Sequence, residues 1–190
     1  MKVIDEKYLN ATSGERTAML QGVDALITKE PGCCICISTA DCIPILLYDR
    51  KNQVVAAAHA GWRGTVNYIA GHTLDRMRAL YGTDGKDVIA CIGPGISLPS
   101  FEVGEEVYEA FRMNGFAMDY ISEWKPETLS IISTCGLQTG SVARLRCTRR
   151  ANRNIWHLYL YEHEEFFSAR RLGIKSGRIL SGIMIVDTKP

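Results

Sequence analysis

A cysteine and a histidine near the ends of neighbouring apolar segments are the residues best suited to chemistry. Cys42 ends the string TADC (39–42), and His59 begins the string HAGWRG (59–64). Their separation of 17 residues accommodates a strand, a turn over 48–52 and a second strand. A β-hairpin of this kind would return His59 to the neighbourhood of Cys42. The spacing therefore predicts one site that contains both residues.

Two chemistries are open to such a pair. A thiolate and a neutral imidazole are good zinc ligands, and a third ligand plus a water would complete an open catalytic site. Alternatively, His59 deprotonates Cys42 to make it a nucleophile, with Asp41 or another group orienting the ring. A buried cysteine and a structural histidine are the third interpretation, and the spacing is compatible with all three.

The residues after His59 favour a ligand-binding role. Gly61 and Gly64 let the backbone approach a ligand closely, and the helix expected to follow offers free N–H groups and a positive dipole end. Arg63 is placed to hold phosphate in a bidentate manner. Trp62 is suited to stacking on a planar base, although such a residue also serves in core packing.

The elements that would position these residues are strands mixed with helices. Helical spacing of apolar residues begins at Thr65 and again at Gly104, where Glu105 and Glu106 fall in the first turn. The pattern predicts strands over 33–39, 43–49, 54–60, 87–93 and 179–186. We therefore expect a mixed α/β (α+β) fold in a single domain over 1–190, large enough to bury a core.

The bulk properties exclude several classes of partner. The chain has a net charge of +1 and 46% hydrophobic residues, so no global charge recruits nucleic acid or an anionic membrane. No stretch approaches the roughly 20 apolar residues of a membrane span. The first ten residues, MKVIDEKYLN, lack the apolar run of a signal peptide. We predict a cytoplasmic protein that binds neither nucleic acid nor membranes.

The cysteines also fit that location. There are seven, an odd number, and four of them crowd into residues 33–42. A secreted disulfide framework would normally be even in number and spread along the chain. Cys33, Cys34 and Cys36 lie on an apolar run, which we interpret as buried small hydrophobic residues.

Taken together, six strings resemble those of one family in order and approximate spacing. They are DALIT (24–28), TADC (39–42), HAGWRG (59–64), IGPGIS (92–97), FEVGEEV (101–107) and FFSARRLGIKSGR (166–178). The family is that of the laccase-domain, or polyphenol oxidase-like, purine nucleoside phosphorylases, and the resemblance covers about 1–129 and 161–190. It implies an α/β/β/α sandwich similar to the deamidase domain of cytotoxic necrotising factor toxins.

The resemblance also implies ligands and contacts. Cys42 and His59 match two of the family's three zinc ligands. From their chemistry and position alone, Asp41 is a candidate partner of a ligand, and Arg170 or Arg171 would add anion contacts. The third ligand is a histidine upstream of the segment that matches residues 3–5. Because this chain begins at Met1, we expect that ligand and the family's N-terminal part to be absent. The remaining histidines are His72, His157 and His163. None of them falls at a position that matches a zinc ligand of the family.

The leading functional hypothesis is a zinc-dependent purine nucleoside phosphorylase with adenosine deaminase and methylthioadenosine phosphorylase activities. Its partners would be a purine nucleoside and phosphate, and nothing indicates the oligomeric state. A copper-dependent polyphenol oxidase is the alternative that the family's older name implies, but multicopper oxidation needs more than four histidines. A Cys–His hydrolase or amidase acting on peptidoglycan precursors is another, because some members are called peptidoglycan editing factors. The last alternative is an inactive, damaged copy.

The damaged-copy alternative arises from residues 130–160, which depart from the family pattern. Trp156 has the single codon TGG, and reading one base later permits Gly-Ile-Cys-Thr-Tyr, the string the family has there. We hypothesise that this segment is translated out of frame and that the frame recovers near Tyr161. The nucleotide sequence tests the hypothesis, because it requires compensating insertions or deletions at both boundaries.

Overall fold

The computed structural model describes residues 1–125, 128–132, 153–154 and 166–186. Most of the segment hypothesised to be out of frame lies outside these residues. So do the cysteines at 135 and 147 and the histidines at 157 and 163.

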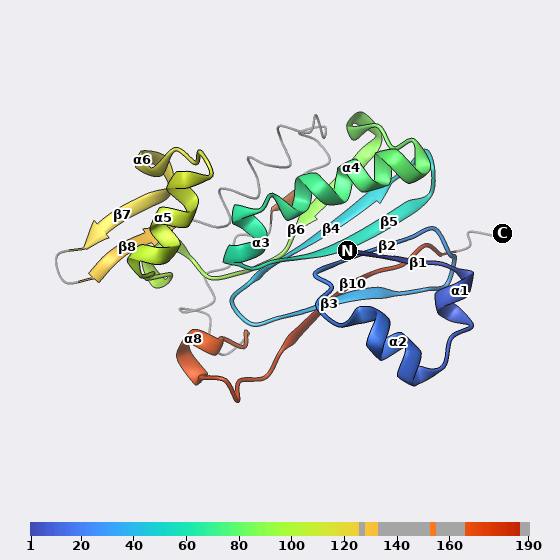
Figure 1. The fold of residues 1–190 in the computed structure, drawn as a ribbon, viewed down its shortest axis with the longest axis horizontal. Coiled ribbons are helices and arrows are strands. Elements are labelled where there is room, and N and C mark those ends of the chain that lie inside the picture. Colours follow the sequence, from blue (N-terminus) through green and yellow to red (C-terminus); the bar gives the residue numbers. More distant parts are fainter. Residues whose placement is uncertain (126–127, 133–152, 155–165, 187–190) are drawn as a thin grey trace.

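A six-stranded mixed sheet forms the centre of the fold (Figure 1). In sheet order its strands are β1 (Lys2–Ile4), β2 (Ala25–Thr28), β5 (Val54–Ala60), β4 (Ile43–Asp49), β6 (Val88–Ile92) and β9 (Arg153–Asn154). The pairs β1–β2 and β6–β9 are parallel and the other three are antiparallel. The predicted mixture of strands and helices is confirmed.

Two apolar layers cover the opposite faces of this sheet. Even-numbered residues of β5, such as Ala56 and Ala58, pack with Leu74 and Met77 of helix α4 (Ile69–Tyr81). Odd-numbered residues of β5 pack instead in a cluster with Ile35 and Ile37 of strand β3 (Ile35–Thr39). This alternation follows from the two-residue period of a strand. Figure 1 shows α4 on one side of the sheet and β3 with β10 (Ile179–Ile183) on the other.

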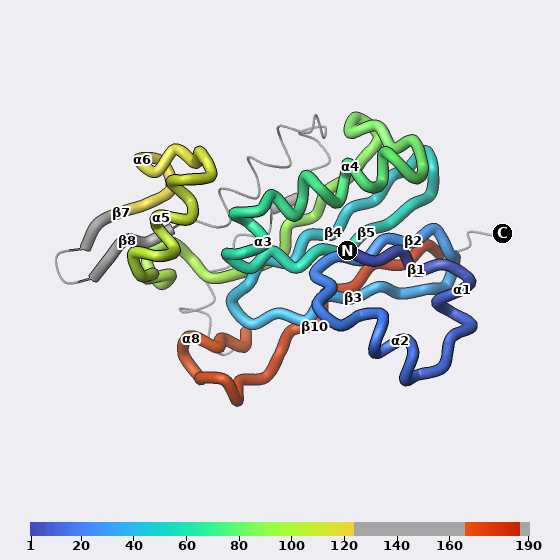
Figure 2. The backbone as a smooth tube through the Cα atoms, in the orientation of Figure 1, coloured from blue at the N-terminus to red at the C-terminus, as the bar shows by residue number. Residues whose placement is uncertain are grey.

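Strands β3 and β10 form a separate antiparallel pair. Figure 2 shows the chain running from α8 (Ala169–Leu172) into β10, which lies beside β3. This arrangement brings the C-terminal motif next to the strand that leads into Asp41 and Cys42.

The exposure of the three cysteines near the start of β3 differs from the expectation. Cys34 is exposed, and Cys33 and Cys36 are half-buried. The interpretation of all three as buried hydrophobic residues is therefore wrong. The reason is that Ile35 and Ile37 occupy the core-facing side of β3, so Cys34 and Cys36, which alternate with them, face outward. Cys33 packs against the apolar cluster but is only half-buried there.

The helix predicted from Thr65 onward is broken into α3 (Trp62–Val66) and α4. At the break, Tyr68 adopts a left-handed backbone conformation with φ of 53°. Its ring stacks on Phe116 and its hydroxyl donates to the Asn114 carbonyl. These contacts with distant residues hold a conformation that helical periodicity alone does not predict.

The remaining elements lie outside the large sheet. The helix predicted from Gly104 is confirmed as α5 (Glu105–Met113). The others are α1 (Glu6–Leu9), α2 (Ser13–Leu20), α6 (Met118–Ile121), β7 (Ser122–Lys125), β8 (Thr128–Ile132) and the 3₁₀ turns Gly85–Asp87 and Leu98–Ser100. Among the residues described, no helix is long and apolar enough to span a bilayer.

A buried carboxylate fixes the turn between β4 and β5. Asp49 is fully buried, and its Oδ1 accepts hydrogen bonds from the backbone N–H groups of Lys51 (2.9 Å) and Asn52 (3.0 Å). Its Oδ2 accepts another from Asn52 Nδ2 at 2.8 Å. Turn geometry sets the register of a hairpin, and here the register places Pro44 opposite His59.

Candidate functional site

Strand alternation places the two predicted site residues on one face of the sheet. His59 pairs with Pro44 in the β4–β5 ladder, and Cys42 precedes Pro44 by two residues. Residues two apart point to the same side of a strand, so both side chains point away from α4 and toward the β3–β10 side. The prediction that the hairpin returns His59 to Cys42 is confirmed.

Gly61 marks the point where the sulfur and the ring converge. A methyl group built on its Cα would lie 3.2 Å from Cys42 Sγ, 3.5 Å from His59 Cε1 and 3.8 Å from His59 Nε2. A side chain at 61 would therefore crowd the sulfur and contact the ring. The absence of a side chain leaves room for a ligand between the sulfur and the imidazole.

Asp24 orients the His59 ring. The Asp24 carboxylate accepts a hydrogen bond from His59 Nδ1 at 3.1 Å, and the Asp24 carbonyl accepts one from the His59 backbone N–H at 2.8 Å. With its proton on Nδ1, the ring presents the lone pair of Nε2 toward Gly61. A carboxylate in this position fixes the tautomer of a metal-binding or catalytic histidine.

The protonation of Cys42 depends on its surroundings. Burial raises the pKa of the Cys42 thiol, the nearby carboxylates of Asp41 and Asp24 raise it further, and Arg178 opposes them. The thiol form is therefore favoured at neutral pH when no cation is bound. A metal ion reverses this preference, because a coordinating thiol loses its proton.

Two cavities flank the pair. One of about 230 Å³ is lined by Asp24, Cys42, His59, Gly61, Trp62, Arg63 and Gly64. A smaller one of about 50 Å³ lies between Asp41, Cys42, Ala60, Gly61, Trp62, Ile96 and Phe101. The first matches the predicted site, because it joins the sulfur and imidazole to the segment after His59.

Trp62 and Arg63 form one unit at the edge of the larger cavity. The Arg63 guanidinium carbon lies 4.2 Å from the centroid of the Trp62 ring, in a cation–π contact. Trp62 also packs against the cluster that contains Val66, Val107 and Phe111. The indole therefore serves both packing and the cavity wall, and it holds the exposed arginine in a defined place.

Asp41 was expected to orient the His59 ring, but its hydrogen bonds are with other residues. Its Oδ2 accepts a hydrogen bond from the Arg170 backbone N–H at 2.7 Å, and its carbonyl accepts one from the Ile96 N–H at 2.8 Å. Asp41 has a positive φ of 80°. It thus joins the loop before Cys42 to α8 and to the IGPGIS turn.

The two arginines of α8 differ in their contacts. The Arg170 guanidinium donates to the Glu102 carbonyl at 2.9 Å and lies 5.7 Å from the centroid of the Phe101 ring. Arg171 donates its backbone N–H to Ser168 Oγ, and its side chain is exposed. Neither lines the two cavities beside Cys42.

The donor set fits a metal ion in part. Thiolate sulfur and imidazole nitrogen are both zinc donors, and they converge beside a cavity with the imidazole already oriented by a carboxylate. Within the described part of the chain, no group of three or more His, Cys, Asp or Glu side chains is arranged to hold a metal. Cys42 and His59 would supply two ligands of a site that needs more than two.

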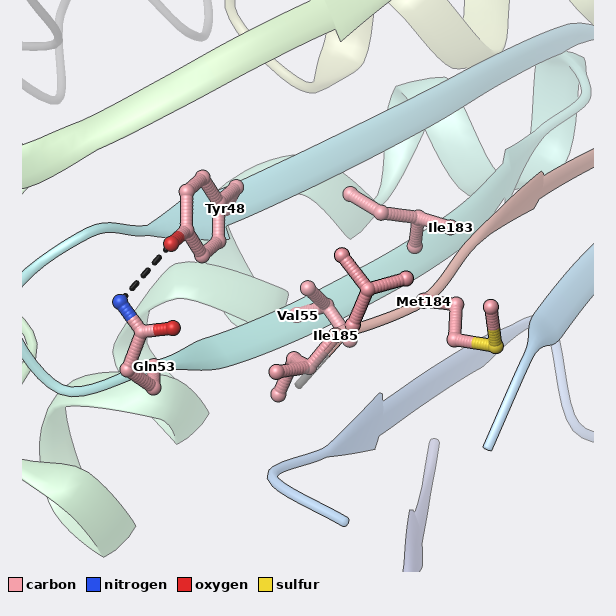
Figure 3. A pocket seen from close by; sticks show the side chains of 7 residues that line it. Tyr48, Gln53, Val55, Ile183, Met184 and Ile185 are labelled. Atoms are coloured by element: carbon pink, nitrogen blue, oxygen red, sulfur yellow. Dashed lines mark hydrogen bonds between the residues drawn. The ribbon is translucent and has the colours of Figure 1, made fainter. Parts of the chain in front are cut away.

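A larger cavity lies on another part of the molecule (Figure 3). It has a volume of about 350 Å³ and is lined by Tyr48, Gln53, Val55, Ile183, Met184, Ile185 and Val186. Its polar groups, Gln53 Nε2 and the Tyr48 hydroxyl, are hydrogen-bonded to each other at 2.8 Å. Because its lining offers no nucleophile or metal ligand pair, we place the candidate site at Cys42 and His59.

Comparison with known families identifies the family of the chain. The model of the family described as multi-copper polyphenol oxidoreductase laccase matches residues 2–186. The chain belongs to this family. The match includes every element that positions Cys42 and His59.

Relatives within the laccase-like family carry names of purine enzymes. A protein named purine nucleoside phosphorylase from Bacteroides thetaiotaomicron is 57% identical over 196 residues, covering 96% of this chain and 68% of the relative. Adenosine deaminase RL5, from an unknown prokaryotic organism, is 41% identical over 184 residues, covering 95% of this chain and 69% of the relative.

A solved structure shares the fold. The crystal structure of the Bacillus licheniformis hypothetical protein YfiH superimposes with a TM-score of 0.80 at 27% identity, covering 85% of this chain. This chain spans 61% of the length of that structure.

Sequence reasoning missed two residues beside Cys42 in this laccase-like site. Asp24 begins the DALIT string, so its place in a family motif was the signal, but nothing local links it to a histidine 35 residues away. Arg178 ends the FFSARRLGIKSGR string and acts on the Cys42 thiol from the segment before β10. Both reach the site through pairing of strands that are distant in sequence.

Proposed function

We propose that this chain is a zinc-dependent purine nucleoside phosphorylase with adenosine deaminase and methylthioadenosine phosphorylase activities. The observation that carries the proposal is the convergence of Cys42 Sγ and His59 on Gly61, beside a cavity that also contains Arg63. Relatives named for phosphorolysis and for adenosine deamination support it. Its partners would be a purine nucleoside and phosphate, and its location the cytoplasm.

In this proposal Cys42 and His59 hold the zinc ion, with Asp24 fixing the His59 tautomer. When bound, zinc supplies Lewis-acid chemistry and lowers the pKa of a coordinated water. Asp24 stabilises the orientation in which Nε2 faces the cavity. Asp41 acts indirectly, by holding the loop of Cys42 against α8.

Arg63 would bind the phosphate that attacks the nucleoside. Its guanidinium is exposed at the cavity and is positioned by the Trp62 ring. Phosphorolysis needs an anion held against the sugar, whereas deamination consumes only water. Trp62 offers a planar face to the base. Additional anion contacts from Arg170 or Arg171 stay a prediction.

A Cys–His hydrolase or amidase is the second candidate. Asp24 orients His59, and His59 lies near Cys42, which is the arrangement of a thiol nucleophile with an oriented general base. Against it, burial and two carboxylates raise the pKa of the Cys42 thiol. A nucleophilic cysteine needs the opposite shift, so the metal-dependent function is favoured.

Metal analysis and turnover separate these functions. We expect about one zinc per chain in the purified protein, release of free base from inosine or adenosine with phosphate, and loss of both on chelation. Cys42→Ser and His59→Asn should lose zinc and turnover. Cys91→Ser and His72→Asn, which alter residues that line neither cavity, should retain them.

Each contrary outcome has a defined meaning. Amide hydrolysis that survives chelation but not Cys42→Ser would replace the proposal with the thiol hydrolase. Oxidation of phenols that requires copper would replace it with the oxidase. Folded protein with neither metal nor turnover would indicate the inactive copy.

We further propose that the fold is the α/β/β/α sandwich of the toxin deamidase domain, in one domain over 1–190. Helix α4, the large sheet, the β3–β10 pair and the N-terminal helices are arranged in that order in Figure 1. An experimental structure of the full chain tests this arrangement.

A further inference from the structure

Two thiols lie side by side at the start of β3, away from the site already described. Cys34 Sγ and Cys36 Sγ are 3.6 Å apart. The residue between them, Ile35, points into the core with a 3% exposed side chain. Strand alternation therefore turns both sulfurs to the opposite, outer side.

The neighbouring strand provides the space that the two sulfurs share. Cys36 is paired with Gly182 of β10. A Cβ atom at position 182 would lie 2.7 Å from Cys36 Sγ and 3.0 Å from Cys34 Sγ. Both sulfurs thus converge over the one residue of β10 that has no side chain.

We propose that Cys34 and Cys36 form a redox-active dithiol that closes reversibly to a disulfide by exchange with a low-molecular-weight disulfide such as oxidised glutathione. The Cys34 thiolate attacks one sulfur of the glutathione disulfide, forming a mixed disulfide and releasing one glutathione thiolate. The Cys36 thiolate then attacks the Cys34 sulfur and displaces the second. The two protons lost by the cysteines are taken up by the two glutathione thiolates. Two protein thiols are thereby oxidised to one disulfide, and glutathione disulfide is reduced to two glutathione thiols.

The local structure assigns different roles to the two cysteines. Cys34 is exposed and precedes the first residue of β3, so its backbone is outside the ladder with β10. Cys36 is half-buried and held in that ladder. An external disulfide therefore reaches Cys34 first, and Cys36 resolves the adduct.

Closure requires the two sulfurs to approach each other and the backbone of Cys34 to adjust. A disulfide has an S–S distance of about 2.05 Å, so the sulfurs must approach by roughly 1.5 Å from their 3.6 Å separation. Because Cys34 lies outside the β3–β10 ladder, it can supply most of that movement without breaking the pairing. Cys33 competes poorly, because it packs against the apolar cluster between β3 and the large sheet.

The experiment is exchange of the full, reduced chain with oxidised glutathione at about pH 8, followed by acid quenching, alkylation of the remaining thiols and tryptic digestion. The peptide 30–50 contains Cys33, Cys34, Cys36 and Cys42. We expect it to lose two hydrogens, with alkyl groups only on Cys33 and Cys42, and to regain two labelled thiols after reduction. The Cys36→Ser variant should instead retain glutathione on Cys34, whereas Cys33→Ser should still close.

Three results would overturn the proposal. They are a lasting glutathione adduct on the unaltered chain, a disulfide that includes Cys33, and full alkylation of Cys34 and Cys36 after exposure to oxidised glutathione. Circular dichroism of each variant verifies that it is folded.

Discussion

Replacement of Asp24 by alanine should weaken zinc binding at Cys42 and His59 by about tenfold. The substitution removes the carboxylate that accepts the His59 Nδ1 proton, so the ring loses its fixed tautomer and orientation. It leaves the hydrogen bond from the His59 N–H to the residue 24 carbonyl, because that bond is made by the backbone. The strand pairing should therefore survive, and the effect should be on the metal rather than on folding.

The geometry sets the magnitude. Loss of a residue that orients a metal ligand typically costs 10- to 100-fold in affinity or activity. The hydrogen bond from His59 Nδ1 to the Asp24 carboxylate is long at 3.1 Å, and the Asp24 side chain is 60% exposed, which indicates the weak end of that range. Removal of Asp24 also lowers the pKa of the Cys42 thiol, which favours the metal-binding thiolate and works in the opposite direction. We therefore expect about tenfold, or about 1.4 kcal/mol.

The assay is zinc titration against a chromophoric chelator of known affinity, with kcat/KM for phosphorolysis measured on the same samples. Asp75→Ala is the matched control, because Asp75 is 59% exposed and also bonded to a basic side chain, Arg78, but lines neither cavity. Unchanged zinc affinity in a folded Asp24→Ala variant would refute the role assigned to this carboxylate. An equal loss in Asp75→Ala would show that the effect is one of general charge.

Three further predictions concern the cavity and the hairpin. Arg63→Ala should raise the KM for phosphate by roughly 10- to 100-fold, the worth of a charged hydrogen bond, and leave adenosine deamination unchanged; equal loss of both activities in steady-state assays would contradict phosphate binding by Arg63. Gly61→Ala should abolish zinc binding, because its methyl group would lie 3.2 Å from Cys42 Sγ. The Tm should change little, because the φ of −72° at this position suits alanine. Calorimetry and metal analysis test this, and normal zinc content would exclude a ligand between the sulfur and the ring. Burial raises the pKa of Asp49, but hydrogen bonds, chiefly from Asn52, outweigh this effect and lower the pKa below the usual value. The ionised Asp49 therefore stabilises the fold fully above about pH 4, and this stabilisation is lost as pH falls through the lowered pKa. In urea unfolding between pH 5 and pH 3, the free energy of unfolding of Asp49→Asn should fall less steeply with acid than that of the unaltered chain, and parallel curves would contradict the prediction.

Local patterns were sufficient to predict the hairpin that forms the site. Alternating and continuous apolar runs fall on β4, β5 and β6 because their side chains pack between α4 and the β3–β10 pair. The turn after Asp49 is short, so the return of His59 to Cys42 follows from the number of residues between them. The helix α5 was predictable for a similar reason, since its apolar spacing and acidic first turn are local.

Other features depend on contacts that no local pattern encodes. The break at Tyr68 is held by Phe116 and Asn114, which lie more than 40 residues further along the chain. The convergence of the Cys34 and Cys36 sulfurs over Gly182 depends on the pairing of β3 with β10.

The sequence by itself determined which residues form the hairpin and that Cys42 and His59 would meet, because the two-residue period of a strand and a short turn act over a few residues. Only the tertiary structure decided that Asp24 orients the imidazole, that Arg178 acts on the thiol and that Asp41 holds α8. The physical reason is that β2 pairs with β5 across 27 to 33 residues of chain, and the segment before β10 arrives from the far end. Pairing of such distant strands is stabilised by the burial of whole sheet faces, and a short stretch of sequence does not show which faces will meet.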